Sequence, residues 1–207
     1  MQETSNSFRG LVMLGPPASG KGTQGRLLAE HLGFSYLSTG AQLRREVGKG
    51  SPRGLEAKDY LDRNHYVPDA LANALASDWL SNQQESWVLD GYPRSLPQAQ
   101  SFWSTRQDFR AIALQVSKAD LQERVSRRRE CLPCGFNTTM EHEICPRCER
   151  ILTAREDDSS QGFQRRFEAY SALTVPALSF LEEKGILWEV DGSGTPAEVS
   201  ERLFALL

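Results

Sequence analysis

The chain has 207 residues, of which 39% are hydrophobic and 25% charged, and its net charge at pH 7 is −3. This length and balance predict a soluble globular protein with one sizeable core and exclude a disordered chain. No stretch approaches the roughly 20 apolar residues that cross a bilayer. The polar residues 1–7 lack the apolar centre of a signal peptide, so we expect a cytoplasmic protein. The acidic balance argues against a general nucleic-acid binder.

The first predicted elements are a buried strand, a glycine-rich loop and a helix, in the stretch LVMLGPPASGKGTQGRLL. Gly15, Gly20 and Gly22 leave room for backbone N–H groups to converge on a phosphate at the start of the helix, and Lys21 adds a cation. The generic phosphate-loop pattern ends in Ser or Thr, but here Gly22 follows the lysine and Thr23 comes one place later. An ordinary strand-to-helix turn is the alternative. Strand, helix and lysine in register favour a phosphate site.

Short apolar runs then alternate with helical stretches along the chain. The runs GLVMLG, SWVLDG, AIALQV and ILWEVDG end at glycine or polar residues, as buried parallel strands do. Helical spacing pairs Leu28 with Leu32 and Leu71 with Leu75, and Thr195 begins a helix that we expect to run to the end of the chain. This alternation predicts an α/β fold, a parallel sheet with helices on both faces. The polar helical region 40–66 and the cysteine-bearing segment 131–152 interrupt it as insertions.

The stretch WVLDGYPRSLPQAQ predicts a second part of the site. Asp90 ends an apolar strand, where open parallel sheets place their ligands, and a carboxylate beside a phosphate loop is suited to Mg²⁺ or its bound waters. Arg94 and Gln98 lie one turn apart beyond it, and they offer a phosphate fork and an amide for a nucleobase edge. A plain turn at Asp-Gly-Tyr-Pro is the alternative.

Arginine is concentrated in one region of the chain. Residues 124–166 contain nine arginines and no lysine. Arg124 and Arg128 are predicted to lie one turn apart on one helix face, where they would share contact with an anion or a base. For the run Arg127–Arg129 alone, a solvated surface charge is an equal alternative.

All four cysteines fall in the stretch CLPCGFNTTMEHEICPRC, as two Cys-x-x-Cys pairs. In a cytosolic chain this spacing predicts a structural Zn²⁺ site with four thiolate ligands, Cys131, Cys134, Cys145 and Cys148. A metal with four protein ligands has no open position for water, so it would stabilise a small hairpin and take no part in catalysis. A redox motif or plain buried thiols are the alternatives.

Several motifs, in this order, resemble those of the adenylate kinases from about Arg9 to the end of the chain. They are GPPASGKGTQ, STGAQLRR, AKDYLDRNHYVPD, LDGYPRSLPQAQ, ERVSRRR, REDD with QRRFEAY, and DGSGTPAEV. In that family Gly-Lys-Gly-Thr ends the phosphate loop. The resemblance implies the P-loop nucleoside monophosphate kinase fold: a core of residues 8–39, 67–130 and 153–207, a monophosphate-binding insertion at 40–66 and a zinc-bearing lid at 131–152.

The resemblance also implies an activity and the residues that perform it. Phosphoryl transfer from MgATP to AMP would give two ADP, in line and without a general base, in an arginine-lined site that closes to exclude water. The implied ATP contacts are Ala18, Ser19, Gly20, Lys21, Gly22, Thr23, Arg124, Arg128 and Gly194. The implied AMP contacts are Thr39, Gly40, Arg44, Tyr66, Val67, Gly91, Arg94, Gln98, Arg155 and Arg166. Transfer itself would depend on Lys21, Arg94, Arg128, Arg155 and Arg166.

The implied cofactors are Mg²⁺, bound with ATP, and the structural Zn²⁺. Thr23 and Asp90 would hold Mg²⁺ through water, while Asp157 and Asp158 would order its waters or make hydrogen bonds in the lid. The expected partners are ATP and AMP, with no nucleic acid and no membrane, and the expected state is a monomer. Some positions depart from the family pattern, namely Ala41, Asn64 and the lid residues Phe136, Asn137, Thr138 and Thr139.

Two other functions remain open. The first is a pyrimidine monophosphate kinase on the same scaffold, which Thr39 and Gln98 disfavour because the pyrimidine enzymes that this chain resembles usually carry alanine and asparagine there. The second is a zinc module that binds nucleic acid and uses ATP as a signal. The negative net charge of this chain and its acceptor-site residues, Arg44, Arg94 and Gln98, argue against a nucleic-acid-binding zinc module.

Overall fold

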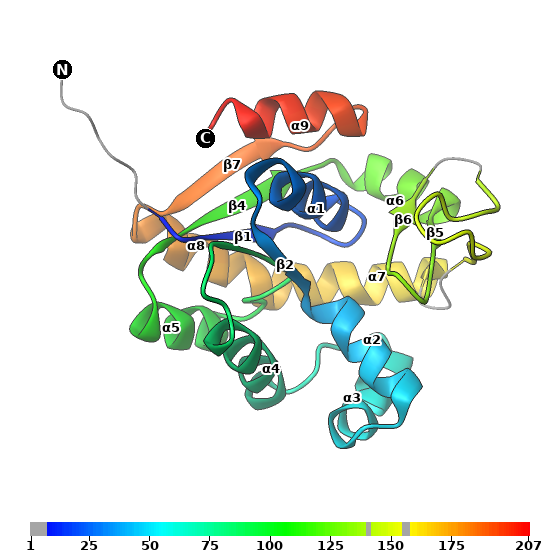
Figure 1. Ribbon diagram of the computed structural model, residues 1–207, viewed down its shortest axis with the longest axis horizontal. Helices are drawn as coiled ribbons and strands as arrows, with labels where there is room; N and C mark the ends of the chain where they lie inside the picture. Colours follow the sequence, from blue (N-terminus) through cyan, green and yellow to red (C-terminus); the bar gives the residue numbers. More distant parts are fainter. Residues whose placement is uncertain (1–7, 140–141, 155–157) are drawn as a thin grey trace.

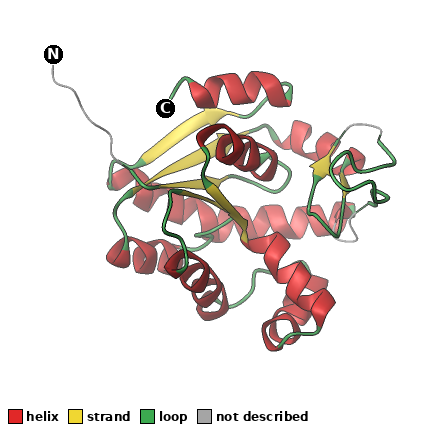
Figure 2. Ribbon diagram, in the orientation of Figure 1, coloured by secondary structure: helices red, strands yellow, loops and turns green. Residues whose placement is uncertain are grey.

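The centre of the molecule is a five-stranded parallel sheet with the strand order β2-β3-β1-β4-β7 (Figures 1 and 2). The computed structural model describes residues 8–139, 142–154 and 158–207. The strands are β1 (Gly10–Leu14), β2 (Ser35–Ser38), β3 (Trp87–Asp90), β4 (Phe109–Gln115) and β7 (Leu187–Asp191). The predicted α/β class is therefore confirmed.

Both faces of the sheet are buried, which explains why its inner strands are continuous apolar runs. On one face, Leu11 and Met13 of β1 pack with residues of α1 (Lys21–Leu32) and α9 (Pro196–Phe204). On the other face, Val12 and Leu14 pack with residues of α4 (Asp69–Ser81), α5 (Leu96–Thr105) and α8 (Val175–Glu183). Alternate residues of one strand thus anchor opposite helical layers.

The sequence analysis found four of these five strands and missed β2. Its sequence, Ser-Tyr-Leu-Ser, is short and half polar, so it carries little of the periodicity that marks a strand. It lies at the edge of the sheet and pairs with β3 on one side. Tyr36 joins the cluster that contains α1, and Leu37 joins the opposite cluster.

The predicted helical pairs are confirmed. Leu28 and Leu32 belong to one apolar cluster, and Leu71 and Leu75 belong to another. At α9, Thr195 forms a complete capping box with Glu198, which satisfies backbone N–H groups at the helix start. This helix ends at Phe204, before the end of the chain, so its predicted extent was slightly too long.

Two groups of elements lie beyond the carboxyl ends of the strands (Figure 1). One is the helix pair α2 (Thr39–Lys49) and α3 (Pro52–Asp62), whose apolar side chains pack on α4. The other follows α6 (Lys118–Arg127) and contains the small antiparallel sheet of β5 (Arg129–Glu130) and β6 (Asn137–Thr138). We call residues 131–152 the cysteine segment. The chain returns through α7 (Ser160–Ala169) and the π-helical turn η2 (Tyr170–Thr174).

The prediction that Arg124 and Arg128 share one helix face was wrong. Helix α6 ends at Arg127, and Arg128 has extended backbone angles, because the chain here leaves the helix to form β5. No helix within the described ranges is long and apolar enough to cross a membrane.

The contact between α2 and α3 yields a prediction, because it depends on a glycine. A Cβ atom at Gly54 of α3 would lie 2.1 Å from the Glu46 carbonyl oxygen of α2. We expect Gly54→Ala to lower the free energy of unfolding by about 1–3 kcal/mol, because the two backbones must separate. Gly48→Ala is the matched control, since nothing lies within 4 Å of a Cβ at this α2 position.

The control should raise stability by up to about 1 kcal/mol, the usual gain of alanine over glycine within a helix. Urea unfolding of the two variants and the wild type measures both effects. Equal stabilities of the two variants would show that the helices do not pack through Gly54.

Candidate active site

The loop between β1 and α1 has the geometry of an anion cradle. Gly15 has a φ of 144°, and a Cβ atom there would lie 2.8 Å from Ser19 Oγ and 3.0 Å from the Leu114 carbonyl oxygen. Gly20 precedes the helix with a φ of 93°, a left-handed conformation that glycine adopts without strain. Lys21 begins α1, and its Nζ donates to the Pro16 carbonyl oxygen at 3.0 Å. The free N–H groups at this helix start can therefore face a phosphate.

The structure explains why glycine follows Lys21 in the phosphate loop. A Cβ atom at Gly22 would lie 3.2 Å from Asp90 Oδ2 and 3.7 Å from the Tyr36 hydroxyl. The Tyr36 hydroxyl in turn donates to Asp90 Oδ2 at 3.0 Å and lies 3.3 Å from the Gly22 carbonyl oxygen. Burial raises the pKa of Tyr36, and the Asp90 carboxylate raises it further, so the hydroxyl stays protonated. A serine or threonine at position 22 would crowd this contact.

Asp90 keeps one carboxylate oxygen uncommitted. The residue is 6% exposed at the end of β3, and its Oδ1 is buried with no hydrogen-bond partner among the described residues. A buried carboxylate oxygen without a donor is costly unless a cation or its waters approach it. Oxygen ligands and water are what Mg²⁺ prefers, so this oxygen fits the expected magnesium site.

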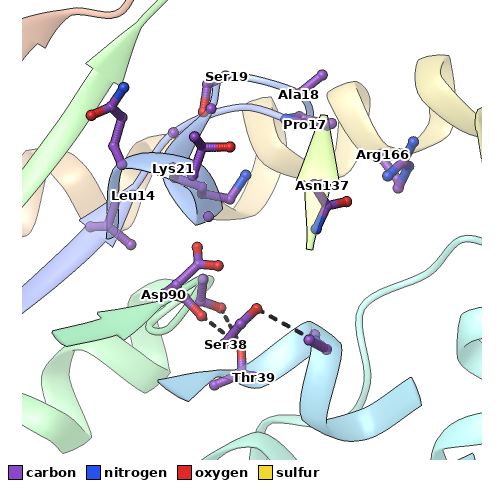
Figure 3. Close-up of a pocket in the computed structure, with 18 of the residues that line it drawn as sticks. Leu14, Pro17, Ala18, Ser19, Lys21, Ser38, Thr39, Asp90, Asn137 and Arg166 are labelled. Atoms are coloured by element: carbon purple, nitrogen blue, oxygen red, sulfur yellow. Dashed lines mark hydrogen bonds between the residues drawn. The ribbon is translucent and has the colours of Figure 1, made fainter. Parts of the chain in front are cut away.

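A cavity of about 430 Å³ connects the loop, the α2 region, the end of β3 and the cysteine segment. Its size is that of a site for a small molecule. Within the described part of the chain, every residue predicted to contact ATP or AMP lines it, as do Thr23 and Asp90, whereas Asp158 does not. Arg155 and Asp157 lie outside the described residues. Figure 3 shows Lys21 and Asp90 facing the same space, with Arg166 and Asn137 across from them.

The pKa of Lys21 is unusually low in this cavity. Burial of its ammonium group lowers the pKa of Lys21 from 10.5 to about 7, against the opposing effect of the Asp90 carboxylate. Three arginines of the cavity wall also lower this pKa: Arg94, Arg128 and Arg166. These cations repel the lysine charge in the absence of a ligand. An anion bound among them would reverse the effect.

The arginines reach the cavity from separate elements. Arg124 donates to the Ser19 carbonyl oxygen at 3.2 Å and to those of Gly192 and Gly194 at 2.8 and 3.3 Å. It therefore ties the loop between β7 and α9 to the phosphate loop. The Arg128 side chain does not share these partners, because it donates to the Asp158 carboxylate, just before α7.

Asp158 holds two of the arginines together. Its carboxylate accepts two hydrogen bonds from Arg128 and one, at 2.7 Å, from Arg166. The Asp158 side chain is 6% exposed, and both arginine side chains are less than 15% exposed. One buried carboxylate therefore orients two guanidinium groups, which fits the lid hydrogen bonds expected of Asp158.

Arg94 is held on several sides. Its Nε donates to the Gly91 carbonyl oxygen at 2.5 Å, and its guanidinium lies over the Tyr66 ring, 5.1 Å from the ring centre. Thr174 of η2 donates to the Arg94 carbonyl oxygen at 2.8 Å. Arg94 precedes α5, whose N-cap is Ser95, so it does not share a helix turn with Gln98 as the sequence analysis expected.

Arg44 and Arg94 converge beside Gly40. A Cβ atom at Gly40 would lie 3.4 Å from Arg94 Nη2 and 3.5 Å from Arg44 Nη1. Arg44 also forms an ion pair of 2.8 Å with Glu130, a residue that is 2% exposed. Thr39 is 4% exposed and its hydroxyl lies 3.2 and 3.0 Å from the Asp90 and Gly91 carbonyl oxygens.

The cysteine segment packs against α1 beside the cavity. Arg26 donates to the Gly135 carbonyl oxygen at 3.0 Å, and Arg147 pairs with Glu30 at 2.5 Å. Arg26 and Glu30 are one turn apart on α1, so both contacts come from one helix face. Residues 135–139 line the cavity and cover it from this side.

The four cysteines form one cluster, as predicted. Their Sγ atoms all lie within 4.8 Å of one another. The Sγ atoms of Cys131 and Cys148 lie 3.3 Å apart, and those of Cys134 and Cys145 lie 3.6 Å apart. Four sulfur atoms about 2.3 Å from a tetrahedral Zn²⁺ would lie about 3.8 Å apart, so the cluster fits that ion. The backbone N–H of Arg147 also points at Cys145 Sγ, at 3.4 Å, as a donor to a thiolate does.

Sequence reasoning missed several residues that position this site. They are Arg26, Tyr36, Asp69, Glu130 and Thr174. Asp69 follows a proline at the start of a helix, and Glu130 is the one acidic residue between the arginine run and the first cysteine, so both carried a weak signal. The other three act through the tertiary fold, and nothing in their local sequence indicates their partners.

The fold and the loop define a P-loop protein of the α/β class that binds phosphate at the carboxyl edge of its sheet. A family model described as "Adenylate kinase" matches residues 13–186. An adenylate kinase of Thermodesulfovibrio yellowstonii is 35% identical over 95% of this chain and 98% of its own length. Adenylate kinases of Methanocella arvoryzae and of a Hydrogenobaculum species are each 36% identical, over 91% and 95% of this chain and 94% and 99% of their own. The chain belongs to the adenylate kinase family.

The lowered pKa of Lys21 is directly testable by NMR. The chain has five lysines, so a sample with ¹³C-labelled lysine side chains gives few signals. We expect the signal of one lysine to titrate near pH 7. That signal should be absent from the spectrum of Lys21→Met. A bound anion stabilises the charged form of Lys21 and should therefore raise its pKa. Without an anion, Lys21 becomes neutral as the pH rises through about 7, so anion binding should weaken over that range.

Sulfate is a suitable probe, since it does not titrate in this range. Added sulfate should move the low titration towards that of the other lysines. Five lysines that all titrate near pH 10 without sulfate would contradict the prediction.

Proposed function

We propose that this chain is an ATP:AMP phosphotransferase, which transfers the terminal phosphoryl group of MgATP to AMP and forms two ADP. The observation that carries this proposal is the convergence on one cavity of a phosphate loop with Lys21 and of arginines from separate elements. Phosphoryl transfer requires two polyanions held in line, with the charge of the moving group offset and water excluded. Family membership supports the same reaction.

The ATP phosphates would bind the loop amides and Lys21, with Arg124 and Arg128 beside them. This assignment is supported by the glycine geometry of the loop and by the bonds of Arg124 to Ser19 and to the loop after β7. The adenine of ATP would lie near the Gly194 backbone. The proposed ATP contacts are Ala18, Ser19, Gly20, Lys21, Gly22, Thr23, Arg124, Arg128 and Gly194.

AMP would bind on the α2 side, with its phosphate near Arg44 and Arg94, which converge beside Gly40. Its adenine would meet Gln98 and the backbone near Val67. Tyr66 supports this assignment indirectly, because its ring lies under the Arg94 guanidinium. The proposed AMP contacts are Thr39, Gly40, Arg44, Tyr66, Val67, Gly91, Arg94, Gln98, Arg155 and Arg166.

Mg²⁺ bound with ATP would offset phosphate charge, and Asp90 and Thr23 would hold it through water. The protein's own contribution is to position charge. Lys21 and the arginines Arg94, Arg128, Arg155 and Arg166 would surround the transferred group. Asp158 pairs with Arg128 and Arg166 and so orients these two. The cysteine segment covers the cavity, which would keep water from competing with AMP for the phosphoryl group.

The proposed reaction predicts a substrate preference. In a coupled assay of ADP formation from ATP, we expect AMP to be used in strong preference to UMP, CMP and GMP. Lys21→Met should lower kcat at least a hundredfold, because it removes the cation and keeps the length of the side chain. Circular dichroism should show an unchanged fold. Equal use of UMP by the wild type would favour the pyrimidine kinase instead, and a Lys21→Met enzyme with a tenth of the wild-type rate would contradict the role of Lys21.

We further propose that the four cysteines hold a structural Zn²⁺ and that the cysteine segment acts as a lid. Among the described residues of this segment, the buried apolar side chains are those of Cys131, Cys145 and Leu152, so a bound metal would supply the stability that a core provides elsewhere. Four thiolates leave the metal no open position, so it would take no part in phosphoryl transfer. Free thiols at this spacing also favour a reducing compartment, the cytoplasm.

Protein purified without added zinc should contain about one zinc per chain with four sulfur ligands by X-ray absorption. Cys145→Ser should lose the metal, lower the melting temperature and make residues 131–152 sensitive to protease while the sheet core stays folded. Leu132→Ser is the matched control, because Leu132 lies in the same segment but is 64% exposed. It should keep the metal. Wild-type protein without metal, with four promptly titratable thiols, would refute the zinc site.

A further inference from the structure

The side-chain amide of Gln98 is held between two partners of opposite kind. Gln98 lies in the first turn of α5, is 2% exposed and borders the cavity. Its Oε1 accepts a hydrogen bond from the Arg94 backbone N–H at 2.8 Å. Its Nε2 donates to Asp69 Oδ1 at 2.6 Å. The two ends of the amide are therefore engaged by different parts of the chain.

These partners determine which way the amide points. A backbone N–H can only donate, and an ionised carboxylate can only accept. If the amide were flipped, its NH₂ would face the Arg94 N–H and its oxygen would face the Asp69 carboxylate. Both contacts would become repulsive within a buried site, where an unpaired polar group is costly.

Asp69 is itself held in place. Its Oδ1 also accepts a hydrogen bond from Ser95 Oγ at 2.9 Å, and Ser95 is 6% exposed. Asp69 is the first residue of α4, and the start of a helix favours a negative charge. Helix α4 therefore presents a fixed acceptor to the start of α5.

The fixed amide leaves one N–H of Nε2 and one lone pair of Oε1 for the cavity. The order of donor and acceptor along this edge is then set by the protein and does not adapt to the ligand. A 6-aminopurine offers a ring acceptor next to an amino donor, whereas a 6-oxopurine offers the reverse order. A site built for one order leaves polar groups unpaired with the other.

We propose that Asp69 is a specificity-determining positioning residue, which fixes the Gln98 amide so that the acceptor site selects a 6-aminopurine monophosphate over its 6-oxo counterpart. This inference rests on the proposed function. Asp69 acts through Gln98 and does not line the cavity.

The test compares Asp69→Ala with Asp69→Asn, using AMP and IMP as acceptors. IMP carries the 6-oxo group and is otherwise the same purine monophosphate. Asp69→Asn keeps a carbonyl oxygen for Gln98 Nε2 and removes the charge, so it is the matched control. We expect the AMP-to-IMP ratio of kcat/KM to fall at least tenfold in Asp69→Ala, mainly through the KM for AMP, and to stay within about threefold of wild type in Asp69→Asn.

A purely structural role of Asp69 would lower the use of both acceptors together and leave their ratio unchanged. That result would overturn the inference, and so would an equal loss of the ratio in both variants, because the charge and not the amide orientation would then matter. Calorimetric dissociation constants for AMP and IMP give the same comparison without turnover. If Asp69→Ala unfolds, Asp69→Ser, which retains a polar group at the helix start but is too short to reach Gln98, takes its place. A wild type that does not use AMP would instead refute the proposed function.

Discussion

Positive charge that converges on one cavity is the constraint on which the rest of the structure depends. Burial of the Lys21 ammonium group is the main cause of its low pKa, and repulsion from Arg94, Arg128 and Arg166 lowers that pKa further. Such a set of cations stays in place only if other groups hold it there. Asp158 bridges two of the arginines, and backbone carbonyl oxygens and the Tyr66 ring hold the others. A bound polyanion would relieve the repulsion, so the cations are already positioned to bind one.

The parallel sheet brings the opposing parts of the site together. Met13, which precedes the end of β1, is in register with Asp90, at the end of β3. The phosphate loop and the carboxylate therefore leave the sheet side by side. Gly22 lets them approach, since a side chain there would meet Asp90. The α2–α3 pair and the cysteine segment then extend beyond this edge (Figure 1). Residues of both line the cavity. Arg44 of α2 also pairs directly with Glu130 of β5, the residue before the cysteine segment.

The two sides of the cavity use different chemistry for recognition. The side near Lys21 presents backbone N–H groups and cations, which bind any phosphate chain of suitable length. The side near Gln98 presents an amide whose direction is set by Arg94 and Asp69. In the proposed reaction, charge would supply attraction for the phosphates, and the order of donor and acceptor at Gln98 would supply discrimination between bases. The cysteine segment adds a cover attached to one face of α1.

Local sequence determined the strands β1, β3, β4 and β7, the phosphate loop and the cysteine cluster, because each follows from short-range periodicity, glycine spacing or ligand spacing. It also identified part of the cavity lining, largely through a family resemblance. Tertiary structure alone decided β2, the end of α6 before Arg128, and the pairings of Gln98 with Asp69, of Arg44 with Glu130 and of Arg128 with Asp158. The half-polar strand β2 forms because it pairs with the neighbouring strand. A buried carboxylate pairs with a particular arginine because the packing of distant elements brings the two together. Neither is encoded in the residues next to it.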